Sequence, residues 1–288
     1  MIGITLALLA SLIWGTGTLF SRKGLQYVQP NIGVFVANSA GCSVGILAGL
    51  LLSRRELFSL SLTAVAWFAL IGVISIGLAN YFYYRGIYLV GASRASPIAA
   101  AAPLLSLPLA MLFLGEHATL SIAFGATGVV GGLYLVTSSG GGDKQVRKRG
   151  YIFALLAALC WSISSLLIRK GVTTFASPLA GTPISLLVGY LVLFPRQGLS
   201  TAFQARRKLW LLLAAGSCSG LGSLLFYSAM SFAPVVVVSP LGNMAPLIAI
   251  TGSHLFLRRL EKVTLRLVLG ALLVLAGAAT ITIGRAAG

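Results

Sequence analysis

Acidic residues are almost absent from this chain. It has four Asp and Glu against 21 Lys and Arg, and only two histidines and three cysteines among 288 residues. His117 and His254 are far apart, and the sequence contains no HExxH motif and no phosphate-binding loop. With so few acids, bases and metal ligands, we expect neither an enzyme active site nor a bound metal or cofactor.

Polar surface is also scarce, because 58% of the residues are hydrophobic, 9% are charged and the mean hydropathy is +0.98. Such a composition cannot cover a water-soluble globule. The Lys and Arg residues lie between apolar runs, so membrane topology explains their excess better than a nucleic-acid partner does. The sequence predicts an all-α polytopic membrane protein with ten transmembrane helices at about 3–20, 32–52, 64–84, 94–114, 119–137, 151–168, 177–194, 209–230, 234–257 and 265–284.

The chain is internally duplicated. The segments 7–24 and 154–171 share ten of eighteen positions at an offset of 147, and Tyr84 and Tyr227 repeat at an offset of 143. An odd number of helices in each unit makes the second unit enter the membrane from the opposite side, so the two five-helix repeats are predicted to be inverted. The predicted boundaries are 1–137 for the first repeat, 138–150 for a basic connecting loop and 151–288 for the second repeat.

The Lys and Arg residues are unevenly divided between the two predicted sides. The connections after the odd-numbered helices carry 16 of them, and the termini with the other connections carry 5. By the positive-inside rule, the richer side faces the cytoplasm and both termini are non-cytoplasmic. We expect a multi-pass protein of the inner (plasma) membrane.

Trp14 and Trp161 fall well inside the first and sixth predicted helices, where lipid offers no partner for an indole N–H. They are predicted to face the protein interior, as cavity walls or gates, with plain core packing as the alternative. Polar residues share helical faces beside them, and interhelical hydrogen bonding is the alternative for each Ser or Thr. The remaining predicted cavity residues are Thr18, Asn38, Asn80, Tyr84, Ser165, Ser223, Tyr227 and Asn243.

Prolines recur in the fourth and ninth predicted helices. Pro97, Pro103, Pro240 and Pro246 are predicted to kink these helices and to act in gating, with irregular packing as the alternative. In the second helix, a stripe of small residues at 41, 45 and 49 permits close helix contact. Packing within the molecule is favoured there, and a homodimer stays open.

A Glu follows each proline-rich helix and is itself followed by a Thr and a Gly-rich helix, in GEHATLSIAFGATGVVGG and LEKVTLRLVLGALLVLAG. Together with a Trp in helices one and six, this ordered and duplicated pattern resembles the EamA-type branch of the drug/metabolite transporter superfamily over essentially the whole chain. The resemblance implies export or exchange of small metabolites through a central cavity between the repeats. It implies cavity-facing roles around Trp14, Asn80, Tyr84, Trp161, Tyr227 and Asn243. Characterised relatives usually keep both termini in the cytoplasm, against the charge count of this chain.

The function expected is secondary transport of a small polar or amphipathic metabolite by alternating access, as export or exchange. Neutral aromatic and amide groups on the predicted lining favour an amino-acid-like solute. The expected partners are this small-molecule substrate and membrane lipid, and no nucleic acid. The alternative is a flippase for lipid-linked sugars or a membrane scaffold that transports nothing.

Overall fold

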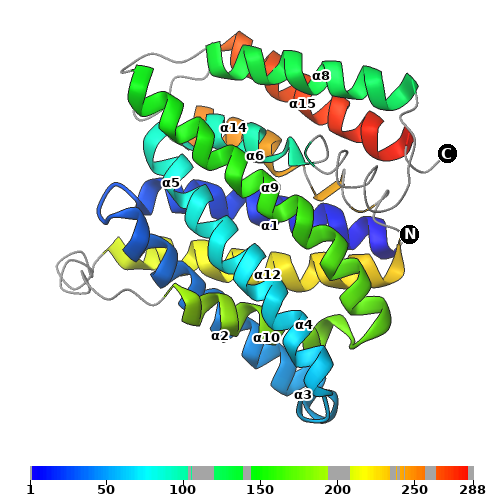
Figure 1. Cartoon of the computed structure of the whole chain (residues 1–288). Helices are drawn as coiled ribbons and strands as arrows, with labels where there is room; N and C mark the ends of the chain where they lie inside the picture. The colour runs from blue at the N-terminus through cyan, green and yellow to red at the C-terminus, as the bar shows by residue number, and fades with distance from the viewer. Residues whose placement is uncertain are drawn as a thin grey trace.

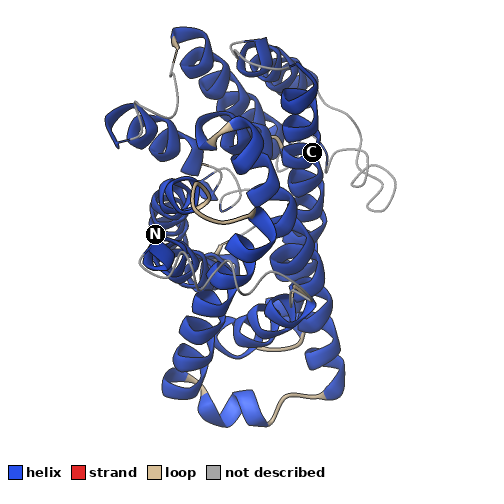
Figure 2. Ribbon diagram, turned by 90° about the vertical axis from the view of Figure 1, so that its left-hand side faces the viewer, coloured by secondary structure: helices blue, strands red, loops and turns tan. Residues whose placement is uncertain are grey.

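A computed structural model describes residues 2–102, 105, 120–138, 144–193, 208–233, 238, 241–242, 244–256 and 264–284. Within these ranges every regular element is a helix (Figure 2). The helices are α1 (Ile2–Gly24), α2 (Pro30–Leu52), α3 (Arg54–Phe58), α4 (Leu62–Ile71), the π-helix η1 (Gly72–Ala79), α5 (Asn80–Val90), α6 (Ala92–Ala99), α8 (Leu120–Ser138), α9 (Lys144–Thr174), α10 (Pro178–Val192), α12 (Leu209–Phe232), α14 (Ala245–Phe256) and α15 (Leu265–Gly284).

Five helices are long and apolar enough to cross a membrane: Ile2–Gly24, Pro30–Leu52, Leu62–Val90, Gln145–Thr174 and Leu209–Phe232. They match the first, second, third, sixth and eighth predicted spans. The other predicted runs contain α6, α8, α10, α14 and α15. The all-helical membrane architecture is therefore confirmed, while the number of ten spans stays a prediction.

The third span is one continuous rod in which α4, η1 and α5 follow each other without a break. Its middle is π-helical, with wider turns than the predicted α-helix. Gly72 begins this segment against the backbone of Ser185 in α10, where a Cβ atom would have no room. The wider turn changes which residues share a face, and this affects the site below.

The sixth span is longer than predicted, because α9 already begins at Lys144. Residues 144–150, placed in the connecting loop by their charge, form the first turns of this helix. Lys, Arg and Gln have a high helix propensity, and a hydropathy profile does not measure this property. Only the beginning of the predicted loop therefore remains a candidate connection, and it lies outside the described residues.

In each half, one long helix packs against helices of the other half. The first helix, α1, packs along α12, whereas α9 packs along α5 and η1, and α2 lies between α12 and α10 (Figure 1). The small-residue stripe of α2 is used in these contacts. A Cβ atom on Gly41 would lie 2.9 Å from the Gly216 carbonyl oxygen of α12, and one on Gly49 would lie 2.8 Å from Pro183 of α10. The stripe thus serves packing within the molecule.

Helices α8 and α15 form a close antiparallel pair at one side of the molecule (Figure 1). A Cβ atom on Gly132 would lie 2.5 Å from the Gly270 carbonyl oxygen, and one on Gly277 would lie 2.5 Å from the Gly125 carbonyl oxygen. Gly125 and Gly270, like Gly132 and Gly277, are 145 residues apart. The two contacts are therefore equivalent when the halves are exchanged.

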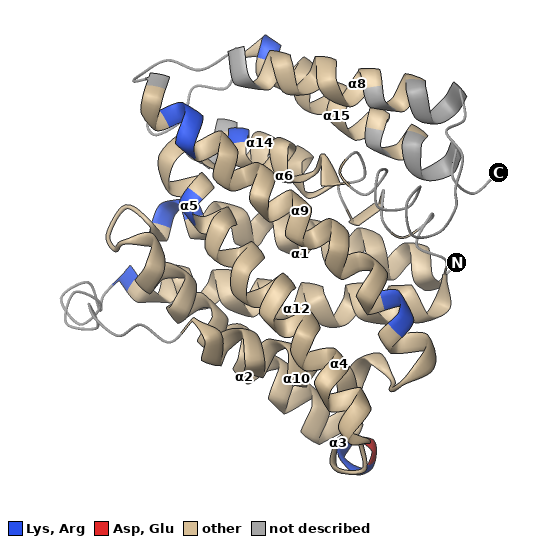
Figure 3. Cartoon of the chain, in the orientation of Figure 1, with Lys and Arg blue, Asp and Glu red and all other residues tan. Residues whose placement is uncertain are grey.

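The described Lys and Arg side chains gather at helix ends (Figure 3). Those of α5 and of the start of α9 lie at the side opposite the first turn of α1. A smaller group, near the end of α9 and in α3, lies at the other side. Charged residues thus mark both ends of an apolar helical bundle.

Candidate functional site

A cavity of about 200 Å³ lies between helices of the two halves. Its walls come from α1, η1, α5 and α6 of the first half and from α9, α12 and α14 of the second. The predicted site residues that line it are Trp14, Thr18, Asn80, Tyr84, Trp161, Ser165, Ser223, Tyr227 and Pro246. Residues nearly 150 positions apart in the sequence thus share one cavity.

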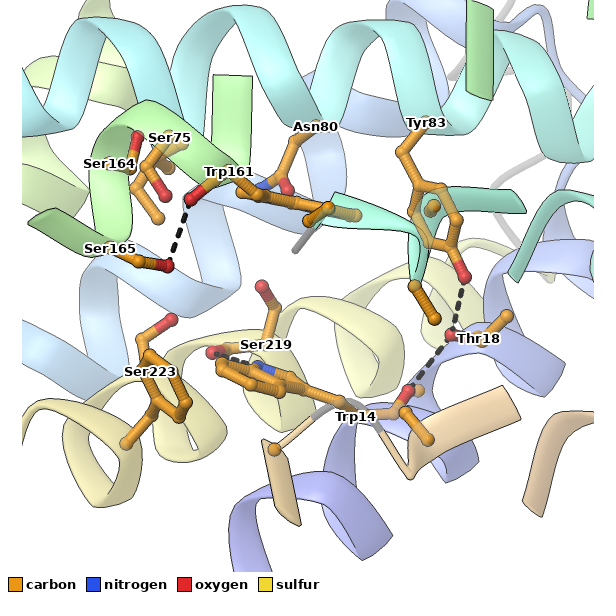
Figure 4. Close-up of a pocket in the computed structure, with 18 of the residues that line it drawn as sticks. Trp14, Thr18, Ser75, Asn80, Tyr83, Trp161, Ser164, Ser165, Ser219 and Ser223 are labelled. Atoms are coloured by element: carbon orange, nitrogen blue, oxygen red, sulfur yellow. Dashed lines mark hydrogen bonds between the residues drawn. The ribbon is translucent and has the colours of Figure 1, made fainter. Parts of the chain in front are cut away.

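The two tryptophans stand on opposite walls (Figure 4). The Trp14 indole donates a hydrogen bond to the Ser219 carbonyl oxygen at 3.4 Å and packs against Phe226 with ring centroids 5.1 Å apart. The Trp161 ring meets Tyr83 edge to face, also at 5.1 Å. An aromatic neighbour holds each indole as a wall of the cavity, and a backbone acceptor also holds that of Trp14.

Asn80 belongs to a buried relay. Its Nδ2 donates to Asn38 Oδ1 at 3.1 Å, and Asn38 Nδ2 donates to the Ile76 carbonyl oxygen at 3.0 Å. Asn38, predicted as a cavity residue, therefore lies behind Asn80 and is not among the lining residues. Ile76 belongs to the π-helix η1, and its carbonyl group lies within hydrogen-bond reach of α2.

Several hydroxyl groups of the lining bond back to their own helix. Thr18 donates to the Trp14 carbonyl oxygen at 2.9 Å, Ser165 donates to that of Trp161 at 2.9 Å, and Ser164 donates to that of Cys160 at 2.8 Å. Bonds of this kind satisfy a hydroxyl proton within the helix. Each oxygen keeps at least one lone pair that can accept from whatever occupies the cavity, although Thr18 Oγ1 also lies 3.2 Å from the Tyr83 hydroxyl.

Tyr84 and Tyr227 are both deeply buried at the cavity. The Tyr84 hydroxyl lies 3.0 Å from Ser21 Oγ of α1, which ties α5 to α1. Tyr227 packs in an apolar cluster with Ile168 of α9. Tyr227 also has the Ser185 side chain of α10 as a polar neighbour, so each of the two tyrosines lies close to a serine.

The predicted proline kinks have separate outcomes. Pro97 lies inside α6 and is buried, but it is not a lining residue. Pro246 lines the cavity in the first turn of α14, where its missing N–H would have no helical partner. Its role in kinking or gating stays a prediction. Pro103, Pro240 and Asn243 lie outside the described residues.

Sequence reasoning missed some lining residues, including Tyr83, Ser75, Ser96, Ser162 and Ser164. Ser75 and Asn80 are five residues apart, a spacing that an α-helix places on different faces but a π-helix brings together. A search at the π-helical period could have found Ser75. No helical period predicts Tyr83, because adjacent residues point to different faces of a helix and Tyr84 also lines the cavity.

No Asp, Glu, Lys, Arg or His contributes to the lining formed by the described residues. The cavity wall there is neutral, with amide, hydroxyl and indole groups set among aromatic and aliphatic side chains.

Two arginines at corresponding positions close the ends of helices. Arg22 of α1 donates to the carbonyl oxygens of Ile87 at 3.1 Å and Tyr88 at 3.3 Å, near the end of α5. Arg169 of α9 donates to the carbonyl oxygens of Met230 and Ala233 at the end of α12. The last carbonyl groups of a helix lack partners within it, and the arginines bond there; the Ile87 carbonyl oxygen also accepts from the Gly91 N–H. Each repeat thus fastens its first helix to the end of its third helix.

An apolar helical bundle with a neutral polar cavity at its centre defines a multi-pass membrane protein of the transporter class. The chain belongs to the EamA-like transporter family, whose model matches residues 1–138 and 148–283. It is thus a membrane transporter of the drug/metabolite transporter superfamily, and the resemblance noted in the sequence is confirmed.

The match falls in two segments, one in each half of the chain. No curated protein matches the chain. A solved structure titled "Crystal structure of protein" is 20% identical and superposes with a TM-score of 0.65, over 99% of this chain and 98% of the other. At this identity the likeness concerns the fold alone.

Proposed function

We propose that this protein is a secondary transporter that carries a small polar or amphipathic metabolite, as export or exchange, by alternating access. The observation that carries the proposal is the cavity of about 200 Å³ whose opposite walls bear Trp14 and Trp161, equivalent residues of the two halves. Small movements of the halves against each other would open such a cavity to one side at a time.

An inverted relation between the repeats is part of this proposal. It is supported by α1 and α9, which run in opposite directions (Figure 1), and by the exchange of packing partners between the halves. The antiparallel glycine contacts of α8 with α15 add to this support, because they map onto each other when the halves are exchanged.

The size and neutrality of the cavity suit a small solute with both apolar and hydrogen-bonding surface. Amino acids and related compounds fit this description. Multivalent anions do not, because the described lining offers no cation to them.

Counterflow into proteoliposomes tests the proposal directly. The purified protein is reconstituted and offered a panel of amino acids, amines, sugars and phosphorylated metabolites. We expect saturable uptake of a small member of the panel, driven by unlabelled solute trapped inside. A protein that moves nothing in the panel and instead flips a fluorescent lipid-linked sugar would contradict the proposal.

Cysteine labelling tests the cavity itself in a variant that lacks the three native cysteines. Ser223→Cys should react with a water-soluble maleimide and be protected by the transported solute. Leu221→Cys is the matched control, since Leu221 lies on the same helix and is 44% exposed at the outer surface of the bundle. Equal labelling at both positions, with no protection, would favour a scaffold.

The proposed orientation places both termini outside the cytoplasm. A C-terminal reporter that is active only in the cytoplasm should therefore be silent. An active reporter would reverse the orientation and leave the transport proposal unchanged.

A further inference from the structure

The relay from Ile76 to Asn80 has a fixed direction. A backbone carbonyl oxygen can only accept, so Asn38 must turn its NH₂ group toward Ile76. Asn38 Oδ1 then faces Asn80 and accepts a hydrogen bond from Asn80 Nδ2. A reversed Asn80 amide would place two acceptor oxygens against each other. Asn80 Oδ1 is thereby set as an acceptor at the cavity wall.

The neighbouring hydroxyls add further acceptors. The hydroxyl groups of Thr18, Ser164 and Ser165 each donate a hydrogen bond to a carbonyl oxygen of their own helix. The Tyr83 hydroxyl lies 3.2 Å from Thr18 Oγ1. Because the Thr18 proton is already donated to the Trp14 carbonyl oxygen, Tyr83 is the donor in this pair. These hydroxyl groups can therefore act as hydrogen-bond acceptors toward the cavity, whereas their protons are already used.

The aromatic walls favour the same sign of charge. The indoles of Trp14 and Trp161 face the cavity from opposite sides (Figure 4). The face of an indole ring attracts cations. Every charged solute loses hydration on entering, and the Asn80 oxygen, the hydroxyl lone pairs and the indole faces offset this loss for an ammonium group.

From these observations we infer that the cavity recognises the ammonium group of its substrate, with Asn80 Oδ1 as the acceptor and Asn38 as the positioning residue. The substrate class is organic amines, including amino acids held by their ammonium end. The carboxylate of an amino acid is dispensable for binding, and acids without an amine are excluded. This inference rests on the proposed function, since it assumes that the cavity is the substrate site.

Equilibrium binding tests the inference without requiring transport. The purified full-length protein in detergent is titrated with phenylalanine, 2-phenylethylamine and 3-phenylpropanoate, and tryptophan fluorescence is recorded. The three probes share one ring and differ in the amine and the carboxylate. The amine should bind within about threefold of phenylalanine, and the acid roughly ten- to a hundredfold more weakly, as expected for the loss of a hydrogen bond with a charged partner.

Asn38→Leu removes the group that orients Asn80, so the Asn80 amide becomes free to turn over. We expect the preference for the amine over the acid to fall to within about threefold, while the variant keeps its elution volume in gel filtration. Asn80→Asp presents only acceptors, and it should retain the preference or increase it. Ser43→Ala is the matched control, because Ser43 is an exposed residue of α2 whose hydroxyl donates to the Ser39 carbonyl oxygen of the same helix.

Equal or tighter binding of the acid, the absence of amine binding, or an unchanged preference in a folded Asn38→Leu protein would overturn the inference. If Asn38→Leu does not fold, Asn80→Asp decides, and a lost amine preference there counts against it. A protein that binds amines selectively but shows no counterflow would contradict the transport proposal and leave the inference standing. A working carrier of carboxylates would sink the inference alone.

Discussion

Adjacent glycines of α8 offer a sharp test of the packing. The position of Gly131 is open, since a Cβ atom there would meet nothing within 4 Å. Gly132 faces α15, and a Cβ atom there would lie 2.5 Å from the Gly270 carbonyl oxygen and 2.7 Å from the Val274 backbone nitrogen. Gly131→Ala and Gly132→Ala thus make the same chemical change on two sides of one helix.

The magnitude follows from two terms. Replacing a helical glycine by alanine stabilises a helix by about 1 kcal/mol, and this term is common to both variants. At Gly132 the two helices must also separate by about 1 Å to restore ordinary van der Waals contact, at a cost of about 1–3 kcal/mol. The difference between the variants is therefore the packing term alone, about 1–3 kcal/mol.

A thermal scan with a thiol-reactive fluorogenic dye measures this difference. The three free thiols, of Cys42, Cys160 and Cys218, are buried or half-buried and become reactive on unfolding. At about 2–4 °C per kcal/mol, Gly131→Ala should melt at or above the wild-type temperature and several degrees above Gly132→Ala. Equal melting temperatures for the two variants would refute the close approach of α8 and α15.

Three further predictions concern other contacts. Glu56→Gln should lower the free energy of unfolding by about 1–3 kcal/mol in the same assay, because the carboxylate accepts two hydrogen bonds from the residue that precedes α10. Arg22→Gln and Arg169→Gln should each increase the labelling of a cysteine placed in the cavity, and they should do so from opposite sides of the membrane. The labelling is measured with an impermeant maleimide in sealed vesicles. An increase from the same side for both variants would contradict the inverted repeats. Gly222→Ala should slow transport more than it lowers the melting temperature, since its Cβ would lie 2.5 Å from the Trp14 Nε1 atom and push the indole into the cavity; unchanged counterflow kinetics would contradict this.

Much of the fold could be predicted because lipid imposes a simple rule on the sequence. A chain in the hydrocarbon region must satisfy its backbone polar groups internally, so apolar runs of sufficient length become helices. The duplication at positions such as Trp14 and Trp161 could be read directly, and it led to both walls of the cavity. Charge misled at residues 144–150, where basic residues continue a helix beyond its apolar part.

The amino-acid sequence by itself determined the helical class, the duplication and the pair of equivalent tryptophans within it. Only the tertiary structure decided which polar residues reach the cavity, because the π-helical turn of η1 brings Ser75 into the lining and Asn38 lies behind Asn80. It also decided the direction of the hydrogen bonds. Local periodicity fixes the face of a regular helix, but a widened turn and a bond across helices depend on neighbours far away in the chain.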